Sequence, residues 1–254
     1  MTTSASVTLG RARTAVVVAL LGIAAASWAY LGLVAAQMGD MSSVLAMPMT
    51  SAWTPPQTGL MVTMWVVMMA AMMLPSALPM VLSYDRVDRG SADGQGGSTP
   101  LFVAGYVVAW GAFAIAATSV QWVLHDMTLV NGMGVATRTG LSSLLLIGAG
   151  IFQFSPSKKR SLGACRTPLG FMATSWRDGR TGALRMGLHH GMLCLRCCWA
   201  LMILLFVLGV MNLAWVAALA IFVLAEKVFR RGELISMLGG VAMIAWGVAA
   251  LLGA

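Results

Sequence analysis

Charged side chains are scarce in this sequence. They make up only 9% of its 254 residues, whereas 59% of the residues are hydrophobic. Soluble domains carry about 25% charged residues, and a soluble fold of this length could not hide so much apolar surface. The mean hydropathy of +0.85 points the same way. The scarcity of charge therefore excludes a soluble globular protein and predicts a polytopic membrane protein.

Long polar segments are also scarce, and no internal repeat with a fixed period occurs. The segment 83–99 carries the run "GSADGQGGST", which predicts a flexible loop. The segment 155–186 contains "CRTPLGFMATSWRDG" and predicts a basic, ordered cytoplasmic loop. We therefore treat residues 1–254 as a single integral membrane domain.

Nucleotide-binding motifs are missing as well. The sequence has no phosphate-cradling glycine loop and no acidic motif for a nucleotide-bound metal. This absence argues against ATP-driven pumping by this chain alone.

Seven apolar stretches are long enough, or nearly so, to cross a hydrocarbon core of about 30 Å. They cover residues 14–36, 59–82, 100–124, 139–154, 187–209, 212–226 and 234–253. Arg11 and Arg13 precede the first stretch, as basic residues do in a signal peptide. Its apolar run is longer than the core of a secretory signal, so we expect a retained helix. The sequence thus predicts an all-α fold, a polytopic helical membrane bundle of about seven transmembrane helices.

The basic residues are sorted by loop, which predicts the orientation of the bundle. The segment 37–58 has no Lys or Arg, whereas the segment 155–186 has seven. A cytoplasmic N-terminus places fourteen basic residues inside and one outside. We therefore expect the N-terminus in the cytoplasm and the C-terminus outside. Because this sorting accounts for the net charge of +8, we expect no nucleic-acid partner.

The sequence has only four cysteines, at positions 165, 194, 197 and 198. In the predicted topology they lie in a cytoplasmic loop or in the membrane, and neither place favours a structural disulfide. Metal binding, redox chemistry and plain packing between helices remain as roles.

The stretch 189–199 reads "HHGMLCLRCCW" and is two-sided as a helix. At about 100° per residue, one face carries an imidazole and three thiols: His190, Cys194, Cys197 and Cys198. A separate face carries His189 and Arg196. Thiolate and imidazole are ligands for soft and borderline metals, although cysteine is also a small hydrophobe that packs well. Ionisable groups within a membrane helix indicate function, although His189 could simply sit at the interface.

Methionine is abundant, with 21 residues against eight phenylalanines. The outer loop "QMGDMSSVLAMPMTSAW" contains Met38, Met41, Met47 and Met49, and the stretch 59–82 contains Met68, Met69, Met72 and Met73 near its middle. A methionine in a helix is usually a filler of the core. Four methionines in a polar loop have no core to fill, and thioethers suit Cu(I). The pattern resembles the way copper-import channels present thioethers.

Glu226 and Lys227 end the sixth predicted span at about the level of His189 and His190. Glu226 could orient a histidine or balance Arg196. Equally, Glu226 and Lys227 could form an interfacial pair of little consequence. The supporting group around the ligands is predicted to contain His189, Arg196, Glu226, Lys227 and Cys165.

Three longer segments carry a resemblance to a known family. "MWVVMMAAMMLPSALP", "FQFSPSKKRSLGACRTPLGF" and "GLHHGMLCLRCCWALMILLFVLGVMNLAWVAALAIFVLAEK" resemble the bacterial family domain of unknown function 2182, predicted metal-binding integral membrane proteins. The resemblance covers residues 59–227 and implies a multi-pass protein of the bacterial inner (plasma) membrane. In this sequence Arg196 replaces an expected glycine, and Ser161 replaces an expected cysteine.

The resemblance also implies a set of important positions. They are Trp65, Met69, Met72, Met73, Pro75, Gln153, Pro156, Lys158, Cys165, Arg166, Pro168, His190, Cys194, Cys197, Cys198, Trp199, Met202, Met211, Asn212, Glu226 and Lys227.

Three functional hypotheses follow. The first is a metal-binding membrane protein that handles Cu(I) in transport or delivery, with the outer-loop methionines collecting the ion, the helical methionines carrying it, and the cysteines with His190 holding it. The second is a membrane thiol redox enzyme, in which Arg196 or a protonated histidine lowers a thiol pKa. The third is a non-catalytic accessory subunit whose Cys, Met and Trp residues only pack. We favour the first, a role without catalysis, with lipid, a metal ion and an oligomer or a metallochaperone as partners.

Overall fold

The computed structural model describes residues 2–37, 54–90, 97–129, 139–210 and 212–253, with side chains from residue 13 onward. Within these ranges all regular structure is helical. The helices are α1 (Thr2–Gln37), α2 (Pro55–Gly90), α3 (Thr99–Asp126), α4 (Thr139–Phe152), α5 (Pro156–Arg166), α6 (Pro168–Ser175), α7 (Gly179–Ile203), α8 (Leu205–Leu208), α9 (Leu213–Val228) and α10 (Gly232–Leu252). The predicted all-α fold is therefore confirmed for the described residues.

Within the described ranges, five helical segments are long and apolar enough to cross a membrane. They are Arg13–Ala36, Pro55–Gly90, Thr99–Asp126, Gly179–Leu208 and Gly232–Leu252. A sixth arises if α4 and α5, which meet at a bend of 62°, form one broken span. At 1.5 Å per residue, α4 and α9 are about 21 and 24 Å long and fall short of the core thickness. The expectation of seven spans thus stays a prediction beyond the five or six that length and composition support.

Two segments predicted as loops are partly or largely helical. The first half of the predicted loop 83–99 continues α2 to Gly90. Arg89 pairs with Asp85 one turn earlier, and Thr99 Oγ1 donates to the same carboxylate, so this end of α2 is tied to the start of α3. The predicted loop 155–186 contains α5, α6 and the first turns of α7.

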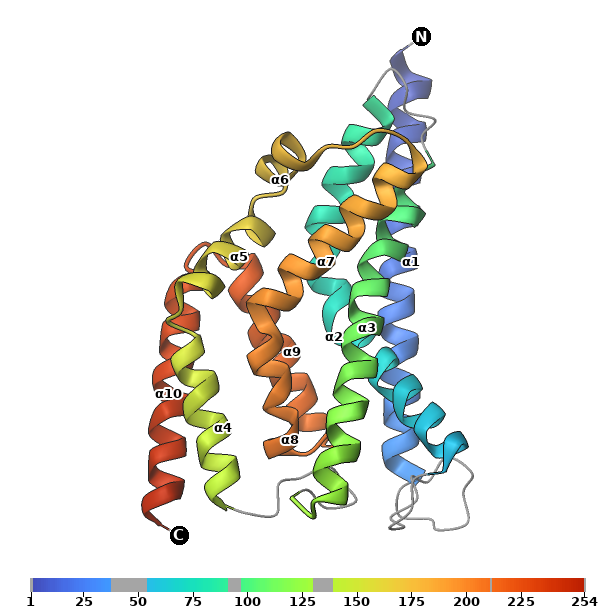
Figure 1. Ribbon diagram of the computed structural model, residues 1–254. Helices are drawn as coiled ribbons and strands as arrows, with labels where there is room; N and C mark the ends of the chain where they lie inside the picture. The colour runs from blue at the N-terminus through green and yellow to red at the C-terminus, as the bar shows by residue number, and fades with distance from the viewer. Residues whose placement is uncertain (1, 38–53, 91–96, 130–138, 211, 254) are drawn as a thin grey trace.

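The helices form two groups with α7 between them (Figure 1). The long helices α1, α2 and α3 lie on one side, and the shorter α4, α9 and α10 lie on the other. The principal pairings are α3 with α7, α4 with α10, and α1 with α2. The two termini lie at opposite ends of the bundle (Figure 1). This arrangement places α7 where helices of both groups can contact it.

Glycines allow α3 and α7 to approach closely. A Cβ atom added to Gly187 would lie 1.9 Å from the carbonyl oxygen of Phe102, and one added to Gly105 would lie 2.1 Å from that of Leu184. No side chain fits at either position without moving a backbone. Small residues at such crossings are typical of packed membrane helices. The contact fixes how α7 is rotated relative to α3, and thereby which residues face the core.

Candidate metal centre between α2 and α7

The thiols of α7 lie on its buried face. Cys194, Cys197 and Cys198 are exposed by 0%, 2% and 0%, and His190 by 3%. His189 and Arg196 are exposed, on the other face that the helical spacing predicts. The structure therefore brings the three thiols into the core and places His189 and Arg196 away from them.

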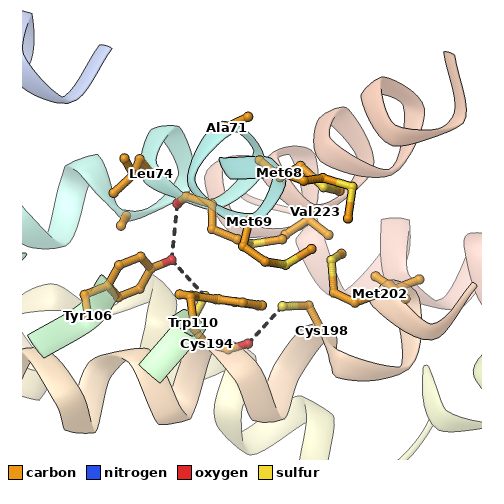
Figure 2. Packing of buried hydrophobic residues seen from close by; sticks show 14 of the residues in the cluster. Met68, Met69, Ala71, Leu74, Tyr106, Trp110, Cys194, Cys198, Met202 and Val223 are labelled. Carbon is orange, nitrogen blue, oxygen red and sulfur yellow. Dashed lines mark hydrogen bonds between the residues drawn. The ribbon is translucent and has the colours of Figure 1, made fainter. Parts of the chain in front are cut away.

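The methionines of α2 belong to the same hydrophobic core as these thiols. Met68, Met69, Met72 and Met73 are all buried and join Cys194, Cys197 and Cys198 in one cluster. Figure 2 shows the Met69 side chain of α2 extending toward α7, on the side that carries Cys198 and Met202. Met202 stands four residues after Cys198, one helical turn further along α7. Pattern analysis left Met202 out of the ligand set, although the family resemblance pointed to it.

Cys194 has two polar neighbours from other helices. Lys227 Nζ of α9 lies 2.9 Å from Cys194 Sγ and donates to Ser76 Oγ at 2.9 Å. The Tyr106 hydroxyl of α3 lies 3.2 Å from the same sulfur and donates to the carbonyl oxygen of Met73 (Figure 2). A cation beside a sulfur favours negative charge on that sulfur. Helices α2, α3, α7 and α9 therefore meet at Cys194.

The other two thiols of α7 are turned toward the backbone. Cys197 Sγ and Cys198 Sγ each lie 3.0 Å from the carbonyl oxygen of Cys194 and donate to it. Among the described residues, no group of three or more His, Cys, Asp or Glu side chains is arranged to hold a metal ion. A metal bound by these thiols would replace their hydrogen bonds with metal–sulfur bonds, and thioethers would complete the set.

The fourth cysteine approaches the cluster from α5. Helix α5 packs on α7, and Cys165 lies against the core cluster that contains Cys197, so the two thiols can interact. Unlike the thiols of α7, Cys165 is partly exposed, and all four cysteines are free. The sequence placed Cys165 in the supporting group, whereas the structure puts it next to a predicted ligand. The missing signal was the packing of α5 on α7, which sequence spacing does not reveal.

His190 sits among aromatic rings. Its ring lies against those of Tyr106, Phe171 and Phe102, with centroids 5.5, 5.7 and 6.1 Å away. Among the described residues, none is a hydrogen-bond partner of its buried Nδ1. Tyr106 thus contacts His190 through its ring and Cys194 through its hydroxyl. The structure does not set His190 directly among the thiols, so its role as a ligand stays a prediction.

The predicted partners of Glu226 and Lys227 are wrong. The Glu226 carboxylate accepts from Lys158 Nζ of α5 at 2.8 and 2.9 Å, and both side chains are buried. Lys158 also donates to Gln153, which accepts from Ser236 of α10 as well. Glu226 therefore neither orients a histidine nor balances Arg196. Glu226 and Lys227 do not pair with each other at the interface, because adjacent residues of a helix point about 100° apart.

The outer-loop methionines Met38, Met41, Met47 and Met49 lie outside the described residues, as does Met211. The role of the four outer-loop methionines in collecting the ion stays a prediction.

The fold and the site define a class of protein: a chain whose regular structure is helical wherever it is described, with membrane-length helices and buried thiols and thioethers in one core. Residues 62–250 match the family described as PpoB2, copper chaperone, and the chain belongs to this family. The match supports a copper-related role, under a family name other than domain of unknown function 2182. No curated protein and no solved structure matches the chain.

Proposed function

We propose that this protein binds Cu(I) within its helical bundle and delivers it from the membrane. One observation carries the proposal: three thiols of α7, four thioethers of α2 and the thioether of Met202 are all buried in the same hydrophobic core. Thiolate and thioether sulfur are the soft ligands that select Cu(I). The family to which the chain belongs is described by the same metal.

Cys194, Cys197 and Cys198 are the principal ligands in this proposal. Thiolates in an apolar core carry negative charge that needs a counter-charge. Lys227 supplies it, because its ammonium lies 2.9 Å from Cys194 Sγ. Met69 and Met202, which belong to the same buried cluster as Cys198, add neutral sulfur (Figure 2).

The methionines of α2 provide a path along the bundle. Met61, Met64, Met68 and Met72 recur at helical spacing and are all buried. Neutral thioethers bind Cu(I) without adding charge to the apolar core, so the ion can pass from one to the next. The outer-loop methionines would feed this path from outside, and the predicted orientation makes the direction inward.

Burial argues against the alternative of a thiol redox enzyme. Exchange with a substrate disulfide requires an accessible thiolate. The thiols of α7 are exposed by 2% or less. Thiol trapping separates the ideas: a copper site is protected by metal and exposed by chelator, whereas a redox pair cycles between oxidised and reduced forms.

The test is anaerobic Cu(I) loading of the purified protein, followed by competition with a chromogenic Cu(I) chelator. Wild type should retain stoichiometric copper, and a Cys194→Ser, Cys197→Ser, Cys198→Ser variant should lose it. Arg196→Gly is the matched control on the exposed face of α7. Equal copper retention by the triple variant and the wild-type protein would refute the assignment of these cysteines as ligands.

A further inference from the structure

The four cysteines form a series of three buried thiols and one thiol nearer the surface. Cys194 and Cys198 are completely buried, and Cys197 is exposed by 2%. Cys165 packs against this cluster from α5, next to Cys197, and is the partly exposed member. A sulfur-bound ion that leaves the core through these residues therefore reaches Cys165 last.

Helix α5 is built to hold Cys165 at this position. Lys158, Ser161, Leu162 and Cys165 recur at the spacing of one helix face, and the first three are buried. Lys158 anchors the start of α5 to α9 through its ion pair with Glu226. Because this buried pair is costly to break, it keeps the face of α5 turned toward α7.

We infer that Cys165 is a transfer ligand, through which Cu(I) passes between the buried thiols of α7 and an external thiol acceptor. This inference rests on the proposed function. Cu(I) exchanges between sulfurs when an incoming thiolate binds before the outgoing one leaves, so neighbouring thiols move the ion without releasing it into water. The partly exposed Cys165 is the position at which an acceptor thiol can join the series.

The transfer step is balanced without an oxidant or reductant. A Cu–S bond to Cys165 forms as the bond to a buried thiol breaks, and copper remains Cu(I). The thiol proton of Cys165 passes to the sulfur that copper leaves. The acceptor thiol then repeats the exchange at Cys165. Lys159 and Arg160 are exposed on the same helix, which favours an acceptor with acidic side chains around its thiols.

The test compares copper release by the full-length protein in detergent, loaded with Cu(I) under anaerobic conditions. Two acceptor probes are used: glutathione, and a water-soluble peptide with a Cys-x-x-Cys pair. Cys165→Ser should keep the copper stoichiometry but transfer the ion about 10-fold or more slowly to the preferred probe. Ser161→Ala, one turn earlier on the same buried face, should transfer at the wild-type rate. Preference for the peptide or for glutathione tells a protein acceptor from a small thiol.

A second measurement needs no variant. A bulky hydrophilic maleimide should modify Cys165 of the native protein before the other cysteines, with and without bound Cu(I), because the held ion lies on the buried thiols. Equal transfer rates in Cys165→Ser and wild type overturn the inference and leave the proposed function standing. Loss of all copper from Cys165→Ser also overturns it, because Cys165 would then be a holding ligand. Failure of wild type to bind copper refutes the proposed function itself.

Discussion

At the scale of single residues, few charged side chains lie in the core. Glu226 is neutralised by Lys158, and the two are buried together. Lys227 instead has Cys194 Sγ and Ser76 Oγ as its partners. A cation that is partly buried among thiols stabilises thiolate more than thiol. Lys227 is therefore the residue beyond the ligands on which copper affinity should depend most.

Lys227→Met should weaken Cu(I) binding by about 10-fold, in line with the loss of a residue that supports a metal ligand. Lys227→Arg keeps the cation and should bind more tightly than Lys227→Met. The measurement is chelator competition under anaerobic conditions. An affinity of Lys227→Met equal to that of wild type would remove Lys227 from the site.

The thioethers can be tested without breaking the fold. Met69→Leu with Met202→Leu replaces sulfur by carbon at similar volume, so each change should cost under about 1.5 kcal/mol of stability. We expect fewer sulfur neighbours around bound copper in X-ray absorption spectra. Met80→Leu, a buried methionine later in α2, is the control and should leave the spectrum unchanged.

At the scale of helices, close backbone contact and one ion pair set the site. The α3–α7 crossing depends on Gly105 and Gly187, which lets Tyr106 reach Cys194. The Lys158–Glu226 pair joins α5 to α9 beside the cluster. Both devices lie outside the proposed ligand set, yet each positions a helix that carries part of it.

Gly187→Ala should destabilise the bundle by about 1–3 kcal/mol, because the added methyl group has no room and forces the helices apart. Gly22→Ala in α1, where nothing lies within 4 Å of the added carbon, should be close to neutral. Thermal unfolding in detergent, followed by circular dichroism, compares the two. Equal melting temperatures of the two variants would contradict this expectation, because α3 and α7 would then move apart at little cost in stability.

Breaking the buried ion pair should be costly. Lys158→Met leaves the Glu226 carboxylate buried without its cation and should destabilise the protein by about 3–5 kcal/mol. The double variant Lys158→Met, Glu226→Gln should recover much of that loss, since it leaves no uncompensated charge. Unfolding by denaturant in detergent measures both, and additive losses would contradict a direct pairing.

At the scale of the whole molecule, the architecture leaves the membrane orientation to be tested. The termini lie at opposite ends of the bundle (Figure 1), as an odd number of crossings requires. We expect the N-terminus in the cytoplasm and the C-terminus outside. A reporter active only in the cytoplasm should be active at the N-terminus and inactive at the C-terminus. Activity at both ends would require an even number of crossings.

Local chemistry explains what the sequence by itself determined. Low charge and long apolar runs predicted membrane-length helices, because those properties belong to each segment separately. The helical period predicted that His190, Cys194, Cys197 and Cys198 share a face and that Arg196 does not. Sulfur-rich composition predicted a soft metal, and the family match supports copper.

Contacts between helices were decided only by the tertiary structure. These contacts join residues from different helices: Tyr106 with Cys194, Lys227 with the same sulfur, Glu226 with Lys158, and Cys165 with the cluster that contains Cys197. Such pairings depend on how each helix is rotated and shifted against its neighbours. Close contacts at glycines and side-chain packing set those rotations. The spacing of residues along one helix does not predict them.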